Sequence, residues 1–276
     1  MLTFAGQIDR SMTELTKEGV ERGKSDERIK LGIIGFGFRG EQLARAMGFA
    51  TEDWIEEQKL IAAKEPRDTT LKDFYELSDL RVEITGVCDV YDTRLKKGGQ
   101  AFSEKAKVYR DYKELLKEKS IDAVIIATPD HWHAAMASDA AKAGKHVYLE
   151  KCMTRTAEEA VQLRNIIKTE GVIFQLGHQG RQSDSNQKAK QLIDQGTLGK
   201  ISLVETTTNR NNPFGAWLWP IEEDGSINTI DWEMFEGPAE HKMPFDAARY
   251  FRWRCWYDYG TGMAGDLLTH EYDALN

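Results

Sequence analysis

The chain has 276 residues, which is enough for one large domain or two small ones with hydrophobic cores. A net charge of −8 argues against a nucleic-acid-binding protein, because such proteins concentrate lysine and arginine on one face. The apolar runs are too short to span a bilayer, and three widely spaced cysteines fit a reducing compartment better than a disulfide framework. Residues 1–28 form a polar leader without the pattern of a signal peptide. We therefore expect a cytoplasmic protein, unless an export signal has been removed.

Residues 29–178 alternate between short apolar runs and helical patterns. Strands are predicted at 29–34, 82–88, 123–127, 146–149 and 172–176, and helices at 41–49, 112–119, 134–143 and 156–170. The run at 123–127 is apolar throughout, which is typical of a parallel strand that is buried on both faces. The alternation predicts an α/β fold with a doubly wound parallel sheet, that is, a Rossmann domain. A charged segment at 51–79 is predicted to be a helical, solvent-facing insertion.

A glycine motif lies between the first predicted strand and the first predicted helix. Gly35, Gly37 and Gly40 have the G-x-G-x-x-G spacing, which acquires meaning in this strand-to-helix context. Such glycines permit a tight turn, a close approach of the backbone to a pyrophosphate, and close packing of helix on strand. The free N–H groups of the following helix would bind the phosphates. The cofactor-binding residues predicted here are Gly35, Phe36, Gly37, Phe38, Arg39 and Gly40. The alternative is a glycine-rich turn that binds no ligand.

An acidic residue, Asp89, ends the second predicted strand, where it would hold the ribose hydroxyls of a dinucleotide. Its distance from Gly40 exceeds the usual spacing of about 20 residues, and the insertion at 51–79 accounts for the excess. A carboxylate here favours NAD over NADP because it repels a 2′-phosphate, although Arg94 could weaken that preference. Asp89 could instead be a turn or capping residue.

Four residues after the third strand are also candidate cofactor contacts, because ligands gather at the carboxyl ends of parallel strands. Thr128, Pro129, His131 and His133 could touch the nicotinamide or its ribose. A His-x-His pair can also be a metal motif. We predict no metal, since no other carboxylate and histidine set has ligand-like spacing.

The next predicted strand, 146–149, ends in Glu150 and Lys151, which are also candidate cofactor contacts. A lysine at this end of a parallel strand faces the cofactor crevice, where it can orient or deprotonate an alcohol. The alternative is a surface lysine in a strand–helix loop.

Residues 179–276 differ in character and are predicted to form a second domain for substrate binding and oligomerisation. The pattern favours a helix over 188–195 and a strand over 201–208 in an open, mostly antiparallel sheet. The stretch 209–262 is rich in tryptophan, glycine and proline, which suits the lining of a ligand site. Because so short a domain would leave sheet edges uncovered, we expect a C-terminally truncated chain.

Three polar residues near the C-terminal end, Asp266, His270 and Asp273, fall on one face of a predicted helix. A histidine with a carboxylate one turn away can act as an acid–base unit near neutral pH. The alternatives are a capping role for Asp266 and a structural role for His270.

Taken in order, these motifs resemble those of the Gfo/Idh/MocA oxidoreductases. The likeness runs from about residue 28 to residue 276. It rests on Gly35-x-Gly37-x-x-Gly40, Asp89, Ala127-Thr128-Pro129-x-His131-x-His133, Ala143-Gly144-Lys145-His146-Val147, Glu150-Lys151 and Asp266-x-x-x-His270-x-x-Asp273. The stretch from Arg252 to Gly262 is similar to members that act on glycosides and related sugars.

The resemblance implies a Rossmann domain followed by an α/β domain whose open sheet mediates oligomers, so a homo-oligomer is expected. It implies that Lys151 contacts the nicotinamide ribose and the substrate, and that Asp266 and His270 form the substrate-binding and acid–base pair. It also implies that Gln179 and Arg181 lie near the nicotinamide. The expected substrate contacts are Lys151, Arg181, Arg254, Tyr257, Asp266 and His270.

Two positions depart from the family pattern. Cys152 stands where members often have proline, so the turn that aims Lys151 could be looser. Leu268 stands where many members have glycine, so the pocket could be narrower.

These observations predict reversible hydride transfer between NAD and a hydroxyl carbon of a sugar, glycoside or polyol. His270 would take the hydroxyl proton, Lys151 would stabilise the alkoxide, and Asp266 would orient His270 or bind a neighbouring hydroxyl. The first alternative is a glycosidase that retains NAD and acts through a keto-sugar. The second alternative is a cofactor-binding protein without turnover. No nucleic-acid or membrane partner is expected.

Overall fold

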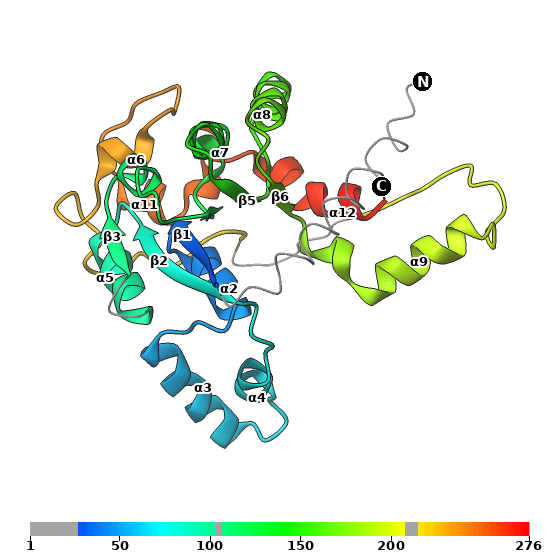
Figure 1. The fold of residues 1–276 in the computed structure, drawn as a ribbon, viewed down its shortest axis with the longest axis horizontal. Coiled ribbons are helices and arrows are strands. Elements are labelled where there is room, and N and C mark those ends of the chain that lie inside the picture. The colour runs from blue at the N-terminus through cyan, green and yellow to red at the C-terminus, as the bar shows by residue number, and fades with distance from the viewer. Residues whose placement is uncertain (1–26, 103–105, 208–214, 276) are drawn as a thin grey trace.

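The computed structural model of the chain describes residues 27–102, 106–207 and 215–275. At its centre is a parallel sheet of six strands in the order β3-β2-β1-β4-β5-β6 (Figure 1). The strands are β1 (Ile29–Ile34), β2 (Val82–Cys88), β3 (Lys107–Tyr109), β4 (Ala123–Ile126), β5 (His146–Glu150) and β6 (Phe174–Gly177). This is the strand order of a doubly wound dinucleotide-binding sheet, and it confirms the predicted Rossmann fold.

Helices cover both faces of this sheet. They are α2 (Phe38–Ala46), α5 (Asp92–Ala101), α6 (Tyr112–Leu116), α7 (Asp130–Lys142) and α8 (Ala157–Glu170). Helices α6, α7 and α8 contribute Leu115, Ala137 and Leu163 to one buried cluster. Helix α2 contributes Ala44 to a second cluster, around Ile33 of β1. The domain therefore has a separate hydrophobic layer on each side of the sheet.

The predicted strands and helices of residues 29–178 are confirmed, with ends that shift by a few residues. Two elements, β3 and α5, were not predicted. β3 has three residues at the edge of the sheet, which is too short for a periodic pattern. α5 contains Gly98, where an added Cβ would lie 2.7 Å from the Val87 side chain. Close packing at this point therefore requires glycine, and glycine weakens the sequence signal for a helix.

The predicted insertion forms two short helices, α3 (Glu52–Lys64) and α4 (Thr70–Tyr75), which follow α2 and lie beyond the start of β2 (Figure 1). Neither helix has a buried residue, as expected for a solvent-facing insertion. The rings of Trp54 and Phe74 lie 5.2 Å apart and hold the two helices together.

The region after β6 departs from the prediction in one respect. Helix α9 (Asp184–Asp194) confirms the expected helix. The strand predicted over 201–208 is wrong, because residues 201–207 form no strand and residue 208 lies outside the described residues. The described part of the chain offers no second sheet with which this segment could pair, and an unpaired strand is not stable. The leader of residues 1–28 lies almost entirely outside the described residues.

The chain after residue 215 returns to the Rossmann domain and packs against the end of β2. Its elements are α10 (Trp232–Glu236), α11 (Ala247–Phe251), the 3-10 turn η2 (Trp253–Cys255), the π-helical turn η3 (Ala264–Leu268) and α12 (Thr269–Leu275). An aromatic cluster joins this region to the sheet: Tyr91 is fully buried against Tyr250 and Phe251. Ile230 also forms a backbone bridge to Tyr91. None of the described helices is long and apolar enough to cross a membrane.

Candidate active site

A cavity of about 810 Å³ opens at the carboxyl ends of β1, β2, β4 and β5. Ile34, Cys88, Ala127 and Lys151 mark the strand ends that reach it. Its volume lies within the range of small-molecule and cofactor sites, roughly 300–1,000 Å³. Ligands of open α/β sheets bind at this edge, where the strand order reverses.

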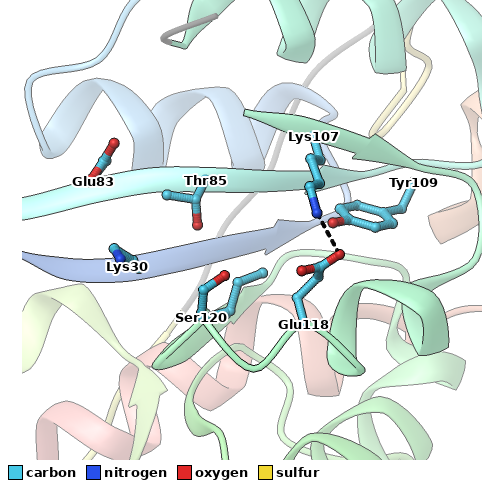
Figure 2. A pocket seen from close by; sticks show the side chains of 8 residues that line it. Lys30, Glu83, Thr85, Lys107, Tyr109, Glu118 and Ser120 are labelled. Carbon is cyan, nitrogen blue, oxygen red and sulfur yellow. Dashed lines mark hydrogen bonds and ion pairs between the residues drawn. The ribbon is translucent and has the colours of Figure 1, made fainter. Parts of the chain in front are cut away.

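A second, smaller hollow of about 240 Å³ lies against β1, β2 and β3 and the residues 118–121 that precede β4 (Figure 2). Lys30, Glu83 and Thr85 line it, and an ion pair of 2.9 Å between Lys107 and Glu118 crosses it. It shares no lining residue with the larger cavity and is therefore separate from the candidate active site.

The glycine turn has the geometry that the sequence predicted. Gly35 has a φ of +89°, and an added Cβ would lie 2.8 Å from the carbonyl oxygen of Ala127. An added Cβ on Gly40 would lie 2.1 Å from the carbonyl oxygen of Gly35. Gly37 and Phe38 line the cavity beside the start of α2. The neighbouring side chain of Phe36 instead points into the core, where it is 1% exposed.

Arg39 lies where it could bind a phosphate. Its side chain lines the cavity, and its Nε pairs with the carboxylate of Glu150 at 2.9 Å. Its Nη2 is buried and has no hydrogen-bond partner among the described residues. The side-chain amide of Gln179 donates a hydrogen bond of 3.1 Å to the Glu150 carboxylate. Gln179 itself does not line the cavity. A guanidinium that lines the cavity beside the glycine turn is suited to an anionic ligand.

Asp89 lines the cavity and also holds the turn that surrounds it. Its carboxylate accepts hydrogen bonds from the backbone N–H of Phe36 at 2.7 Å and of Tyr91 at 3.0 Å. Burial raises the pKa of Asp89, while the positive charge of Arg94 and the amides oppose that change. Because each carboxylate oxygen can accept more than one bond, Asp89 can still receive a ribose hydroxyl.

The predicted contacts after β4 divide into two groups. Thr128 and Pro129 line the cavity, whereas His131 and His133 do not. His131 is 4% exposed and contacts the carbonyl oxygen of Phe235 through Nε2 at 2.8 Å; burial lowers its pKa to about 4. His133 is fully buried, and its two ring nitrogens contact the carbonyl oxygens of Cys152 and Thr128. Both histidines therefore join segments of backbone beneath the cavity.

Lys151 and Asp266 form an ion pair at the centre of the cavity, although 115 positions separate them in the sequence. The Lys151 ammonium also donates to the carbonyl oxygen of Asp266 at 2.6 Å. Arg254 contacts the same carboxylate at 3.0 Å. Burial acts to raise the pKa of Asp266, but these two cations outweigh it and hold the pKa below its ordinary value.

His270 lines the same cavity one helical turn after Asp266. Burial lowers the pKa of His270, and the positive charge of Lys151 lowers it further. The imidazole is therefore neutral at neutral pH and able to accept a proton. Its ring lies 5.5 Å from the ring of His178, which in turn contacts Asp273 at 3.5 Å.

Two predicted substrate contacts lie outside the cavity lining. Arg181 pairs with Asp273 at 2.9 Å on the outer side of α12. Tyr257 is 82% exposed, and the guanidinium of Arg155 lies over its ring. In contrast, Trp253 and Arg254 of the same aromatic stretch line the cavity.

The residues that form one wall of the cavity, and the contacts that anchor them, were not predicted from the sequence. We call residues 217–224 the covering segment: Trp217, Trp219, Pro220 and Glu222 line the cavity. It is tied to the end of β2, because the Tyr91 hydroxyl donates to Glu222 at 3.1 Å and also contacts Asp224. The Trp219 ring lies 5.2 Å from that of Phe38 in the glycine turn. The tryptophans of this segment were a usable signal in the sequence. No sequence pattern marked Glu222 and Asp224, the carboxylates that anchor the segment.

The family profile described as the Gfo/Idh/MocA oxidoreductase family, with an NAD-binding Rossmann fold, matches residues 29–178. The match covers more than half of the chain and coincides with the sheet and its glycine turn. The chain belongs to the Gfo/Idh/MocA family. Levoglucosan dehydrogenase of Pseudarthrobacter phenanthrenivorans is 34% identical over 163 residues, which are 59% of this chain and 34% of that protein. An NADP(+)-dependent scyllo-inositol 2-dehydrogenase of Bacillus subtilis is 31% identical over 125 residues, 45% of this chain and 35% of that protein.

Solved structures of Gfo/Idh/MocA proteins share the fold. Apo scyllo-inositol dehydrogenase from Lactobacillus casei is 25% identical, with a TM-score of 0.50 over 64% of this chain and 44% of that one. An oxidoreductase of Bacillus subtilis, 22% identical, matches 91% of this chain and 53% of its own length, with a TM-score of 0.57. The chain spans roughly a third of the length of the two curated relatives named above.

The contact between Gly40 and the Gly35 carbonyl leads to a prediction. We expect Gly40→Ala to lower the melting temperature and abolish nucleotide binding, because the new methyl group would push the phosphate-facing turn out of place. Fluorescence titration with NADH and a thermal melt measure the two effects. Gly180→Ala is the control, since its backbone is not left-handed and a Cβ there meets only the Asn186 side chain, at 3.8 Å. Unchanged NADH affinity in Gly40→Ala would contradict the role given to the turn.

Proposed function

We propose that this chain binds a nicotinamide dinucleotide in the 810 Å³ cavity and transfers a hydride to or from a hydroxyl carbon of a sugar, glycoside or polyol. The observation that carries the proposal is the meeting of Lys151, Asp266 and His270 in the cavity that the glycine turn borders. Family membership in an NAD-binding oxidoreductase fold supports it. The names of two relatives, a levoglucosan and a scyllo-inositol dehydrogenase, support the substrate class.

The residues around the glycine turn fit a dinucleotide. The amides at the start of α2 and the positive charge of Arg39, which lines the cavity beside them, would hold the pyrophosphate. Asp89 would accept the adenosine ribose hydroxyls, which favours NAD, since a 2′-phosphate would meet a buried carboxylate. The Arg94 guanidinium lies 3.1 Å from the position that a Cβ on Gly37 would occupy. Its positive charge would weaken the preference for NAD over NADP. The bound nicotinamide supplies the hydride chemistry.

Three side chains would handle the substrate. His270, neutral because of burial and the nearby Lys151 charge, would take the hydroxyl proton. The Lys151 ammonium would stabilise the developing alkoxide. Asp266 pairs with Lys151 and Arg254, so its proposed role is to orient the lysine and to bind a neighbouring hydroxyl. The ring of Trp253, beneath the Arg254 guanidinium at 4.1 Å, offers an apolar surface to a sugar ring.

The covering segment favours one second candidate, a glycosidase that keeps its cofactor and acts through a keto-sugar. Its ties to Tyr91 and Phe38 would slow the exit of a dinucleotide. An enzyme that regenerates its cofactor in place benefits from slow release. The ratio of NADH formed to sugar consumed distinguishes the two functions: a dehydrogenase forms one NADH per sugar and the glycosidase forms none.

A homo-oligomer through the second domain remains a prediction.

Substitution of the central lysine and histidine tests the proposed roles. We expect Lys151→Met to lower kcat for polyol oxidation by about 10²–10³-fold, the usual effect of removing an electrostatic stabiliser. We expect His270→Asn to lower it by about 10²–10⁴-fold, the usual effect of removing a proton-transfer group. NADH affinity should change little, because the phosphates bind at the glycine turn. Absorbance of the reduced nicotinamide over a panel of polyols measures turnover. Full turnover in both variants would refute the assignment.

The lowered pKa of His270 leads to a pH prediction. We expect the NMR titration midpoint of His270 to lie below the ordinary imidazole value of 6.5, and to rise in Lys151→Met, because a neighbouring positive charge is removed. Oxidation rates should therefore stay high as the pH falls through 6.5 and decline only below it. A midpoint above 6.5 in the unsubstituted protein would contradict this prediction.

The covering segment can be tested by the rate at which NADH leaves. We expect Trp219→Ala to raise that rate about tenfold, the effect of losing roughly 1.4 kcal/mol of aromatic contact. Displacement of prebound NADH, followed by fluorescence, measures it. Trp54→Ala removes an indole from the insertion instead and serves as the control. Equal rates in the two variants would show that the segment does not retain the cofactor.

A further inference from the structure

Two buried polar residues at the start of α7, Asp130 and His133, lie beneath the Lys151–Asp266 pair. They are 4% and 0% exposed and stand three positions apart, on one face of the first turn of the helix. Neither lines the cavity, so neither can touch a ligand there. Buried polar side chains are costly unless they make specific hydrogen bonds, and the partners of these two define what they do.

His133 connects α7 to the residue after the central lysine. Its Nδ1 contacts the carbonyl oxygen of Cys152, and its Nε2 contacts that of Thr128 at 2.9 Å. The imidazole thus bridges the loops that follow β4 and β5. Because Cys152 is bonded to Lys151, fixing its carbonyl restricts the backbone from which the lysine side chain extends.

Asp130 connects α7 to the residue before the central carboxylate. Its Oδ2 accepts a hydrogen bond of 2.6 Å from the Thr261 hydroxyl. The Thr261 side chain lies directly against Gly265, where an added Cβ would come within 2.0 Å of Thr261 Oγ1. Gly265 immediately precedes Asp266. The Cys152 thiol also contacts Thr261 at 3.5 Å, so the two connections meet below the cavity.

We propose that Asp130 and His133 are positioning residues that set the relative placement of Lys151 and Asp266. One connection ends a single residue after the lysine, and the other ends a single residue before the aspartate. The cavity side chains therefore depend on a buried polar layer that no ligand touches. The kinetic consequence rests on the proposed function, whereas the geometric consequence does not.

Chemical labelling tests the geometric consequence without any substrate. The probe is an acetylating N-hydroxysuccinimide ester, and the readout is the labelling rate of Lys151 relative to Lys145, by peptide mass spectrometry. Lys145 is a suitable internal reference, since it is buried elsewhere and bonded to the carbonyl oxygens of Glu118 and Ile121. We expect His133→Gln and Thr261→Val each to raise the ratio of Lys151 to Lys145 labelling about tenfold. This is the effect expected when the equilibrium constant for forming the Lys151–Asp266 ion pair falls tenfold.

Two controls separate positioning from general loss of stability. Thr261→Ser keeps the hydroxyl and should restore the labelling ratio of the unsubstituted protein. Leu163→Ala creates a cavity in the core on α8 and should lower the melting temperature without raising the ratio. A ratio that rises as much in Leu163→Ala as in Thr261→Val, or one that stays unchanged in both His133→Gln and Thr261→Val, would overturn the proposal.

The kinetic consequence is tested on the same variants. We expect kcat for polyol oxidation to fall about 10–100-fold in His133→Gln and Thr261→Val, as for a misplacement of reacting groups by up to about 1 Å, with NADH affinity unchanged. A loss of NADH affinity in place of kcat would contradict a positioning role. If the unsubstituted protein oxidises no polyol, the proposed function fails, while the labelling ratio still decides the positioning proposal.

Discussion

The ion pair between Lys151 and Asp266 is the contact on which the candidate site depends. It joins the end of β5 to the π-helical turn η3 across 115 positions of sequence, with both side chains about nine-tenths buried. Taking two charges out of water costs free energy that their attraction only partly offsets. The pair therefore contributes to placement more than to stability, because it holds two distant segments in one geometry.

Two different kinds of structure meet at this pair. The parallel sheet supplies the rigid side, in which the glycine turn, Asp89 and Thr128 follow directly from the ends of hydrogen-bonded strands. The region after residue 215 supplies the other side, with short helices and no strand among its described residues. It gains its order from the aromatic cluster around Tyr91 and from the ties of the covering segment. Lys151 therefore follows a strand of the sheet, whereas Asp266 and His270 lie on the segment that packs against it.

The residues that sequence reasoning treated alike have different roles in the structure. Thr128 and His133 belong to one motif, yet the first faces the cavity and the second bridges two carbonyl groups below it. Cys152 stands where the family often has proline, and its turn is restrained by the contacts of its thiol with Thr154 and Thr261. Burial raises the pKa of that thiol to about 11, so it remains protonated and able to donate.

The sequence by itself determined the Rossmann sheet, the glycine turn at Gly35 and the acidic end of β2. Each of these depends on local signals. The period of the apolar residues indicates which face is buried, and a glycine indicates a backbone position where a side chain would not fit. Only the tertiary structure decided which of the candidate polar residues face the cavity and which contacts hold them there. The partners of Lys151 and Tyr91 lie 115 and 133 positions away, on the region that the aromatic cluster packs against the sheet. No local pattern encodes this packing, because its free energy arises only once the separate segments have come together.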